Sequence, residues 1–169
     1  KKDSIYRQYH QNDISFSLTY AFSENFTLPL SHDEVVYGKK SLLGRMPGDE
    51  WQRFANLRLM YAYMYSHPGN KLLFMGADIG QYEEWNYNGS LDWNLLDYPV
   101  HSGLNKLVKD LNSIYKKYPA LYEKQFSPDG FEWISYDDSQ NAILCYLRKG
   151  RESKNDLVII CNFTPTVLN

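Results

Sequence analysis

The clearest helical pattern in the chain begins after Asp49. Apolar side chains then recur at every third or fourth position, as on one face of an amphipathic helix. They are Trp51, Phe54, Leu57, Tyr61, Met64 and Tyr65. Asp49 can cap the first turn, and Gln52 stands where a capping box needs its reciprocal side chain. Pro68 ends the pattern. A helix over residues 50–67 is therefore predicted, with these apolar side chains buried along one face.

Short apolar runs on either side of this helix predict strands. Residues 26–30 (FTLPL) form the first run, although Pro29 cannot donate to a ladder and argues against a central strand. Residues 72–75 (LLFM) form the second run, and its unbroken apolar character predicts a strand buried on both faces. The order strand, loop, helix, strand is typical of a βαβ unit in a parallel sheet.

Further helices flank this unit, and the pattern changes to strands near the end of the sequence. Ile14 and Leu18 lie at helical spacing and predict a short helix within residues 14–22. A longer amphipathic pattern predicts a helix over residues 102–118, which Pro119 ends.

Beyond residue 130 the apolar runs are short and separated by polar turns. Residues 131–136 and 142–148 flank a polar turn and predict a hairpin, and residues 157–163 predict a third strand. The predicted fold class is therefore α/β followed by all-β, with a boundary between residues 1–122 and residues 123–169.

Two polar loops follow the predicted strands, and they hold the residues with candidate chemistry. His32, Asp33 and Glu34 come directly after the strand at 26–30, where the site of an α/β sheet or barrel lies. The second loop, residues 77–101, combines carboxylates with aromatic rings. Its candidate site residues are Asp78, Trp85, Asp92 and Trp93. Paired carboxylates among aromatic rings are typical of chemistry on glycoside bonds.

Each of these residues also has an ordinary structural interpretation. Acidic loop residues are often solvated or cap helices, and we favour that interpretation for Glu83, Glu84 and Asp97. Trp85 and Trp93 could pack the loop rather than contact a ligand. For His32 and Asp33 the placement directly after a strand favours function.

Composition narrows the possible classes of partner. Aromatic residues make up 16% of the chain, which suits contact with sugar rings, whereas the net charge of −2 gives no footprint for nucleic acid or an anionic membrane. The histidines and cysteines show no metal-ligand spacing, and no nucleotide-binding glycine motif occurs, so no metal and no cofactor are predicted. Cys145 and Cys161 lie in strand-like runs and are expected to be free thiols.

The sequence also bears on location and completeness. No apolar run of about 18 residues and no signal peptide occur, which favours a soluble, cytoplasmic protein. The chain begins at Lys1 without a methionine, which indicates a piece of something longer.

Three motifs in order resemble bacterial-type glycogen (1,4-α-glucan) branching enzymes of the α-amylase superfamily. They are LPLSHDEVVYGKKSLLGRMPGDEWQRFANLR, LLFMGADIGQYEEWNYNGSLDW and FSPDGFEWI. The resemblance implies that residues 1–122 are the last two β/α units of a (β/α)8 TIM barrel, and that residues 123–169 begin a C-terminal β-sandwich. It also implies a retaining double displacement that transfers α-1,4-glucan chains to a 6-hydroxyl in glycogen.

The same resemblance assigns roles to individual residues. Asp33 matches the carboxylate that stabilises the transition state, and His32 matches the histidine that contacts the same sugar. Glu34, Asp78, Trp85, Asp92 and Trp93 are implied substrate contacts. Asp78 departs from the family, which usually has a glutamate there. The nucleophile and the acid/base of the family lie on earlier strands that this chain does not contain, so the isolated chain is expected to be inactive.

Two alternatives remain open at this point. One is a related α-glucan hydrolase of the trehalose-releasing type, against which the lysine-containing loop after Glu34 argues. The other is a non-catalytic glucan-binding or structural module. A closed barrel needs about 250 residues, so its other strands are expected to come from the parent protein, or the exposed strands to be covered by self-association.

Overall fold

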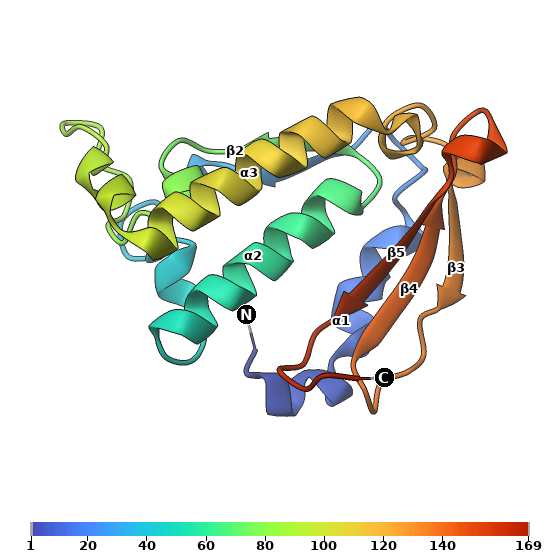
Figure 1. Ribbon diagram of the computed structural model, residues 1–169, viewed down its shortest axis with the longest axis horizontal. Coiled ribbons are helices and arrows are strands. Elements are labelled where there is room, and N and C mark those ends of the chain that lie inside the picture. The colour runs from blue at the N-terminus through green and yellow to red at the C-terminus, as the bar shows by residue number, and fades with distance from the viewer. Residues whose placement is uncertain (1, 169) are drawn as a thin grey trace.

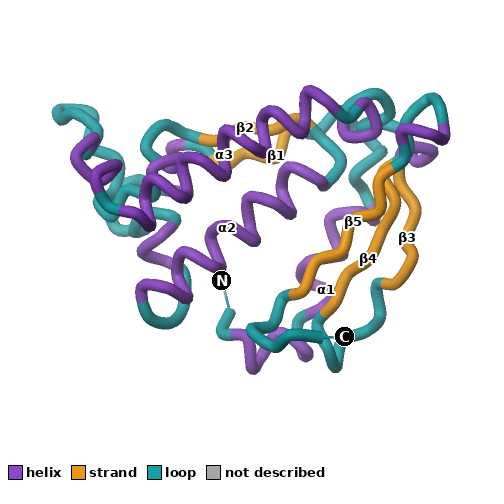
Figure 2. Tube along the Cα trace, in the orientation of Figure 1, coloured by secondary structure: helices purple, strands orange, loops and turns teal. Residues whose placement is uncertain are grey.

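The computed structural model describes residues 2–168 and contains two small sheets on opposite sides of a pair of long helices (Figure 1). The helices and strands in chain order are α1 (Gln11–Ser15), β1 (Thr27–Leu30), α2 (Glu50–Ser66), β2 (Asn70–Leu73), α3 (Pro99–Lys117), β3 (Phe131–Ser135), β4 (Ile143–Arg148) and β5 (Leu157–Asn162). Long loops gather at one end of α2 and α3 (Figure 2). Within residues 2–168 no helix combines the length and apolar character needed to cross a membrane.

Helix α2 begins at the predicted capping box. The Asp49 carboxylate accepts from the Gln52 N–H at 2.9 Å, and the Gln52 side chain accepts from the Asp49 N–H at 2.9 Å. The helix ends at Ser66, one residue before the predicted end. The predicted apolar face is confirmed except at Trp51, which is 65% exposed. At 3.6 residues per turn Trp51 lies roughly 120° around the helix from Leu57, outside the buried stripe.

Strands β1 and β2 pair in parallel, as the βαβ pattern predicted, from Thr27 opposite Asn70 to Leu30 opposite Leu73. The carbonyls of residues 26 and 30 accept from β2 and the residue that follows it, both at 2.9 Å. The backbone N–H and C=O groups of the even-numbered residues of β1 therefore point toward β2. Those of the odd-numbered residues point away from it, so the N–H that Pro29 lacks would not have bonded to β2. This placement explains why a proline is compatible with the strand.

The prediction of a strand over residues 72–75 buried on both faces is wrong. Strand β2 begins at Asn70, and Leu72 and Met75 are 41% and 60% exposed. Successive side chains of a strand point to opposite faces. Leu73 packs on the helices together with Leu30 of β1, whereas the other face of the two-stranded sheet lies open.

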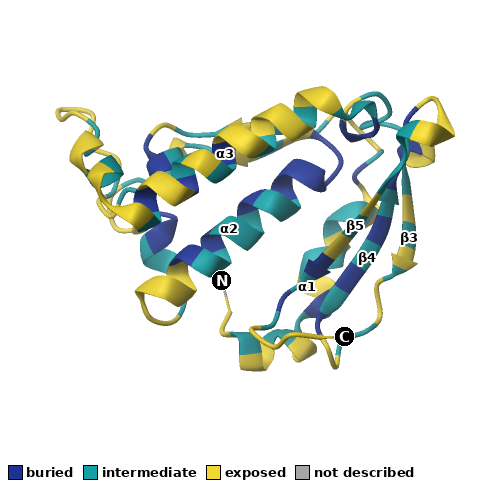
Figure 3. Ribbon diagram, viewed as in Figure 1, coloured by how far each residue is buried: buried dark blue, intermediate teal, exposed yellow. Residues whose placement is uncertain are grey.

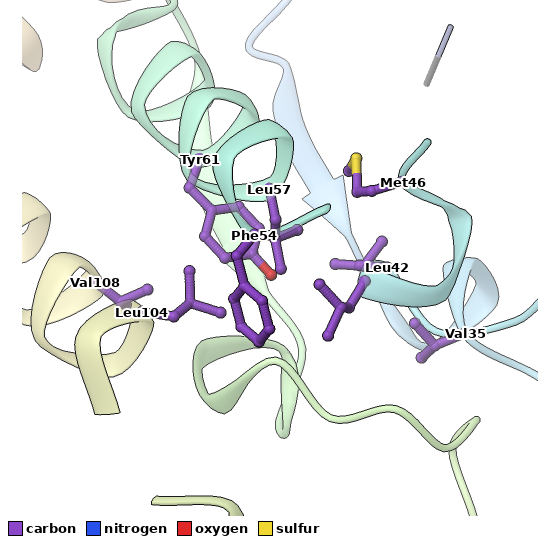
Figure 4. Close-up of a cluster of buried hydrophobic side chains, with 9 residues drawn as sticks. Val35, Leu42, Met46, Phe54, Leu57, Tyr61, Leu104 and Val108 are labelled. Carbon is purple, nitrogen blue, oxygen red and sulfur yellow. The ribbon is translucent and has the colours of Figure 1, made fainter. Parts of the chain in front are cut away.

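The main hydrophobic core lies where α2 and α3 pack together and extends under the loop that follows β1 (Figure 4). It consists of Val35, Leu42, Leu43, Met46, Phe54, Leu57, Tyr61, Leu104 and Val108. The buried side of α2 and the exposed outer side of α3 are visible in Figure 3. Because the loop contributes four of these side chains, its path is fixed by burial although it has little regular structure.

Helix α3 begins at Pro99, three residues before the predicted start, with proline in its first turn. The missing N–H of proline costs nothing at that position, because the first N–H groups of a helix have no partner within it. Near the N-terminus the predicted helix over residues 14–22 is wrong beyond its first two residues, because α1 ends at Ser15. Only α1 is α-helical there, and a 3-10 turn over Phe16–Thr19 follows it.

Strands β3, β4 and β5 form an antiparallel sheet in sequence order, which confirms the predicted hairpin and third strand. The sheet packs against α2 through Leu59 and Tyr63. Cys145 and Cys161 are free thiols, as expected. Arg148 on β4 is fully buried and donates to the Ser66 carbonyl at the end of α2 at 2.6 Å, so β4 is tied to the helix.

Candidate functional site

A cleft of about 510 Å³ lies between the loop that follows β1 and the loop that follows β2. Apolar and aromatic side chains dominate its lining, among them Tyr37, Leu42, Tyr61, Phe74, Trp85 and Tyr87. Tyr61 of α2 is fully buried, and its hydroxyl donates to the Ala77 carbonyl at 2.8 Å. Burial raises the pKa of Tyr61, so this phenol remains a donor and fixes the start of the second loop.

His32 and Asp33 lie on a 3-10 turn that begins two residues after β1 ends. The Asp33 side chain is 72% exposed, and its Oδ1 lies 3.4 Å from His32 Nε2. The His32 ring lies edge-on against Trp85 and also contacts Phe74, with centroid separations of 5.5 and 6.1 Å. Neither side chain is among the residues that line the cleft, but His32 contacts Phe74 and Trp85, which do line it. The structure therefore places an accessible carboxylate and an oriented imidazole beside the cleft.

The other predicted site residues separate into two groups. Trp85 and Asp92 line the cleft. Glu34 instead pairs with Arg45 of its own loop at 3.0 Å, and Asp78 accepts from Asn105 of α3 at 3.0 Å. Trp93 is 57% exposed on a separate 3-10 turn and is not among the residues that line the cleft.

Glu84 has a role that the sequence interpretation missed. Its Oε2 accepts from the Gly38 N–H at 3.0 Å, and its Oε1 accepts from the Lys40 N–H at 2.6 Å. The expectation that Glu84 is solvated or caps a helix is therefore wrong. Its carboxylate joins the second loop to the first. The signal in the sequence was only indirect, because Gly38 indicates a tight turn but does not identify the distant group that holds it.

A second hydrogen bond joins the two loops, and another stabilises the first loop internally. The Trp85 N–H donates to the Val35 carbonyl at 2.8 Å, and the Lys39 ammonium donates to the Asp33 carbonyl at 2.8 Å. The exposed rings of Tyr37 and Tyr87, 96% and 79% accessible, also line the cleft. Sequence reasoning missed both tyrosines, although aromatic residues in polar loops were the available signal.

The chemistry of the site suits a ligand with many hydroxyl groups. Aromatic faces pack on the C–H surfaces of sugars, and exposed carboxylates accept hydrogen bonds from hydroxyls. Among residues 2–168 no three His, Cys, Asp or Glu side chains gather in a way that could hold a metal ion. The predicted absence of a metal and of a cofactor stays a prediction.

Comparison with known proteins gives matches along nearly the whole chain. The family described as "Alpha amylase, C-terminal all-beta domain" matches residues 133–169, which include β4 and β5. The 1,4-alpha-glucan branching enzyme GlgB of Aquifex aeolicus is 57% identical over 164 residues, which is 97% of this chain and 26% of that protein. Branching enzymes named GlgB from Rhodopseudomonas palustris CGA009 and Oceanobacillus iheyensis are 55% and 53% identical, over 98% and 99% of this chain and 23% and 26% of their own lengths.

These matches confirm the resemblance that the three motifs indicated, and they favour it over a trehalose-releasing hydrolase or a non-catalytic module. The matched family also agrees with antiparallel strands at the end of the chain. Over nearly its whole length the chain is similar to 1,4-alpha-glucan branching enzymes named GlgB, and it spans about a quarter of the length of the curated relatives it matches.

Proposed function

We propose that this chain is a segment of a 1,4-α-glucan branching enzyme and contributes one wall of its active site. Residues 1–122 supply the last two β/α units of a (β/α)8 barrel, and residues 123–169 begin the C-terminal all-β domain. The parallel pairing of β1 with β2 around α2 supports the barrel part of this proposal. Both strands of that sheet have an open edge within residues 2–168, which further strands of a barrel would pair.

The observation that carries the proposal is the position of Asp33. It follows the carboxyl end of a parallel strand, where barrel enzymes hold their reacting groups, and its side chain is open to a ligand. In the proposed reaction Asp33 accepts hydrogen bonds from sugar hydroxyls, and these bonds strengthen as positive charge develops at the anomeric carbon. His32 contacts the same sugar.

The cleft beside Asp33 would hold α-1,4-glucan, with glycogen as the branched product. Trp85 and Asp92 line it and are the better supported contacts. Glu34, Asp78 and Trp93 are weaker candidates, because two of them bind protein groups and the third lies outside the lining. A retaining mechanism needs a nucleophile and an acid/base about 5 Å apart. We expect other parts of the full-length protein to supply both.

The test uses the full-length protein that carries this chain, incubated with amylose. New α-1,6 linkages at a constant number of reducing ends would support transfer, whereas a rise in reducing ends would show hydrolysis instead. Asp33→Asn should lower turnover at least 100-fold, as loss of a group that stabilises the transition state does. Near-normal turnover of that variant, or turnover by residues 1–169 alone, would contradict the proposal.

A further inference from the structure

We propose that Glu84 is a positioning residue for Asp33, and that it acts by holding the Gly38–Lys40 turn. The inference rests on the proposed function, because it assigns Glu84 a task at the same site. Glu84 does not contact Asp33 directly. Its effect passes through the backbone of the turn and the side chain of Lys39.

The turn that Glu84 holds has an unfavourable backbone conformation. Gly38 has φ of +83° and Lys40 has φ of +61°, so both lie in the left-handed region. Glycine adopts this region readily, but a side chain such as that of Lys40 makes it costly. The two carboxylate oxygens of Glu84 accept from these same two residues, at 3.0 and 2.6 Å. Charge-assisted hydrogen bonds of this kind offset the backbone cost, and a concave pair of N–H groups suits an anion.

Lys39 connects the clamped turn to the candidate catalytic carboxylate. It lies between the two residues that Glu84 binds, and its ammonium donates to the Asp33 carbonyl at 2.8 Å. When Gly38 and Lys40 are fixed, the start of the Lys39 side chain is fixed as well. The backbone of Asp33 is thus held from its own loop by a contact that Glu84 supports from the second loop.

The residue after Glu84 strengthens the case for a built junction. The Trp85 N–H donates to the Val35 carbonyl at 2.8 Å, and the Trp85 ring lies against His32. Two consecutive residues of the second loop therefore hold the first loop on both sides of Tyr37. A carboxylate at position 84 bound only to water would not accept from the Gly38 and Lys40 N–H groups as Glu84 does.

The experiment compares Glu84→Ala and Glu84→Gln in the full-length protein, with Asp97→Asn as a matched control. Asp97 is an exposed carboxylate of the same long loop. Glu84→Ala should lower kcat for branching roughly 10- to 100-fold, since misplacing a catalytic group by about an ångström has effects of that size. KM should change less than threefold. Glu84→Gln keeps one good acceptor oxygen and should recover part of the loss.

Two further measurements separate positioning from a merely structural role. Amide hydrogen exchange at Gly38 and Lys40 should accelerate in Glu84→Ala, and the effects of Glu84→Ala and Lys39→Met on kcat should be strongly non-additive. Unchanged kcat with faster exchange would overturn the proposal, as would fully additive effects. If the wild-type protein forms no α-1,6 linkages, the proposed function fails, and exchange that is unchanged in Glu84→Ala would then overturn the clamp independently.

Discussion

The imidazole of His32 lies edge-on against the indole of Trp85, with ring centroids 5.5 Å apart and planes inclined at 70°. Phe74 completes the group, at 5.4 Å from Trp85 and 6.1 Å from His32. His32 lies in the turn after β1, Phe74 directly follows β2, and Trp85 lies in the second loop. Edge-to-face contacts of this kind restrict the rotation of the imidazole beside the exposed Asp33 carboxylate.

Replacing Trp85 should therefore disturb His32 as well as the cleft wall. We expect Trp85→Ala to lower kcat/KM of the full-length protein about tenfold or more, since aromatic pairs contribute about 0.5–1.5 kcal/mol beyond burial. Three such contacts are lost, with His32, Phe74 and Tyr87. Trp85→Phe should retain a substantial part of the activity. Tyr9→Ala, which removes a 76% exposed ring outside the lining of the cleft, is the control. Equal activity of Trp85→Ala and the wild type would contradict the prediction.

The sequence allowed the elements around the site to be predicted because their signals are local. The capping box at Asp49 and Gln52 lies within one helical turn, and the position of Asp33 follows from a strand that ends nearby. The role of Glu84 could not be predicted from local signals. Its partners are 44 and 46 residues away, and the identity of a carboxylate does not reveal which backbone groups it meets.

Whether an apolar side chain of a predicted helix or strand is buried also depends on which other elements pack against it in the folded protein. Apolar spacing predicted that Trp51 and Leu72 would be buried, yet both are substantially exposed. The spacing identifies the element correctly, but whether a given apolar side chain is covered depends on which neighbours pack there. If the proposed barrel is correct, the open face beside Leu72 is where further structure of the full-length protein is expected.

The capping box of α2 leads to a stability prediction. Asp49→Ala removes the acceptor of the Gln52 N–H and the negative charge at the positive end of the helix. We expect a loss of about 1 kcal/mol in the free energy of unfolding, measured with urea. Asp49→Ser retains an acceptor and should recover most of it. If the alanine variant unfolds at the same urea concentration as the wild type, the cap contributes nothing.

Replacing Arg148 should lower the free energy of unfolding more than replacing Asp49, because Arg148 is fully buried and donates to three carbonyl groups. Its guanidinium donates to Ser66 at 2.6 Å and to Leu121 and Gly130 at 3.3 Å. Arg148→Met removes the donor to the Ser66 and Leu121 carbonyls, whereas the Gly130 carbonyl still accepts from the Lys149 N–H at 3.0 Å. Each carbonyl that stays dry without a donor costs about 1–3 kcal/mol. We expect a loss of at least 3 kcal/mol in urea unfolding.

The control for this variant is Arg151→Met, which removes the same charge from an exposed position of the next turn. It should change the free energy of unfolding by less than about 0.5 kcal/mol. Arg148→Lys should fall between the two, because a lysine offers a charge but cannot reach three carbonyls with the geometry of a guanidinium. A stable Arg148→Met variant would show that packing, not the hydrogen bonds, holds β4 to α2.

His67 should make the stability depend on pH. It is buried, its Nδ1 lies 2.8 Å from the Pro68 carbonyl, and its Nε2 lies 2.9 Å from the Ser17 hydroxyl. The pattern suits a neutral ring that donates from Nδ1 and accepts at Nε2. Burial lowers the pKa of His67 from 6.5 to about 4, the Pro68 hydrogen bond opposes this shift, and the nearby cations Lys71 and Arg148 reinforce it.

The direction of the pH effect follows from the lowered pKa. Between pH 6.5 and 4 the unfolded chain binds a proton at His67 that the folded chain does not bind, so acid favours unfolding. The contribution of the neutral His67 ring to the free energy of unfolding is fully present above pH 6.5 and is lost as the pH falls through about 4. It should amount to on the order of 3 kcal/mol.

Urea unfolding from pH 7.5 down to pH 4.5 measures this loss, and His67→Gln isolates it from the titration of carboxylates. Glutamine keeps a donor and an acceptor but does not titrate, so its free energy of unfolding should fall much less over the same range. His10→Gln is the matched control, because His10 is a partly exposed histidine paired with Asp13 at 3.1 Å. Parallel pH profiles for His67→Gln and the wild type would show that the His67 ring accepts its proton without unfolding, and the prediction would then be wrong.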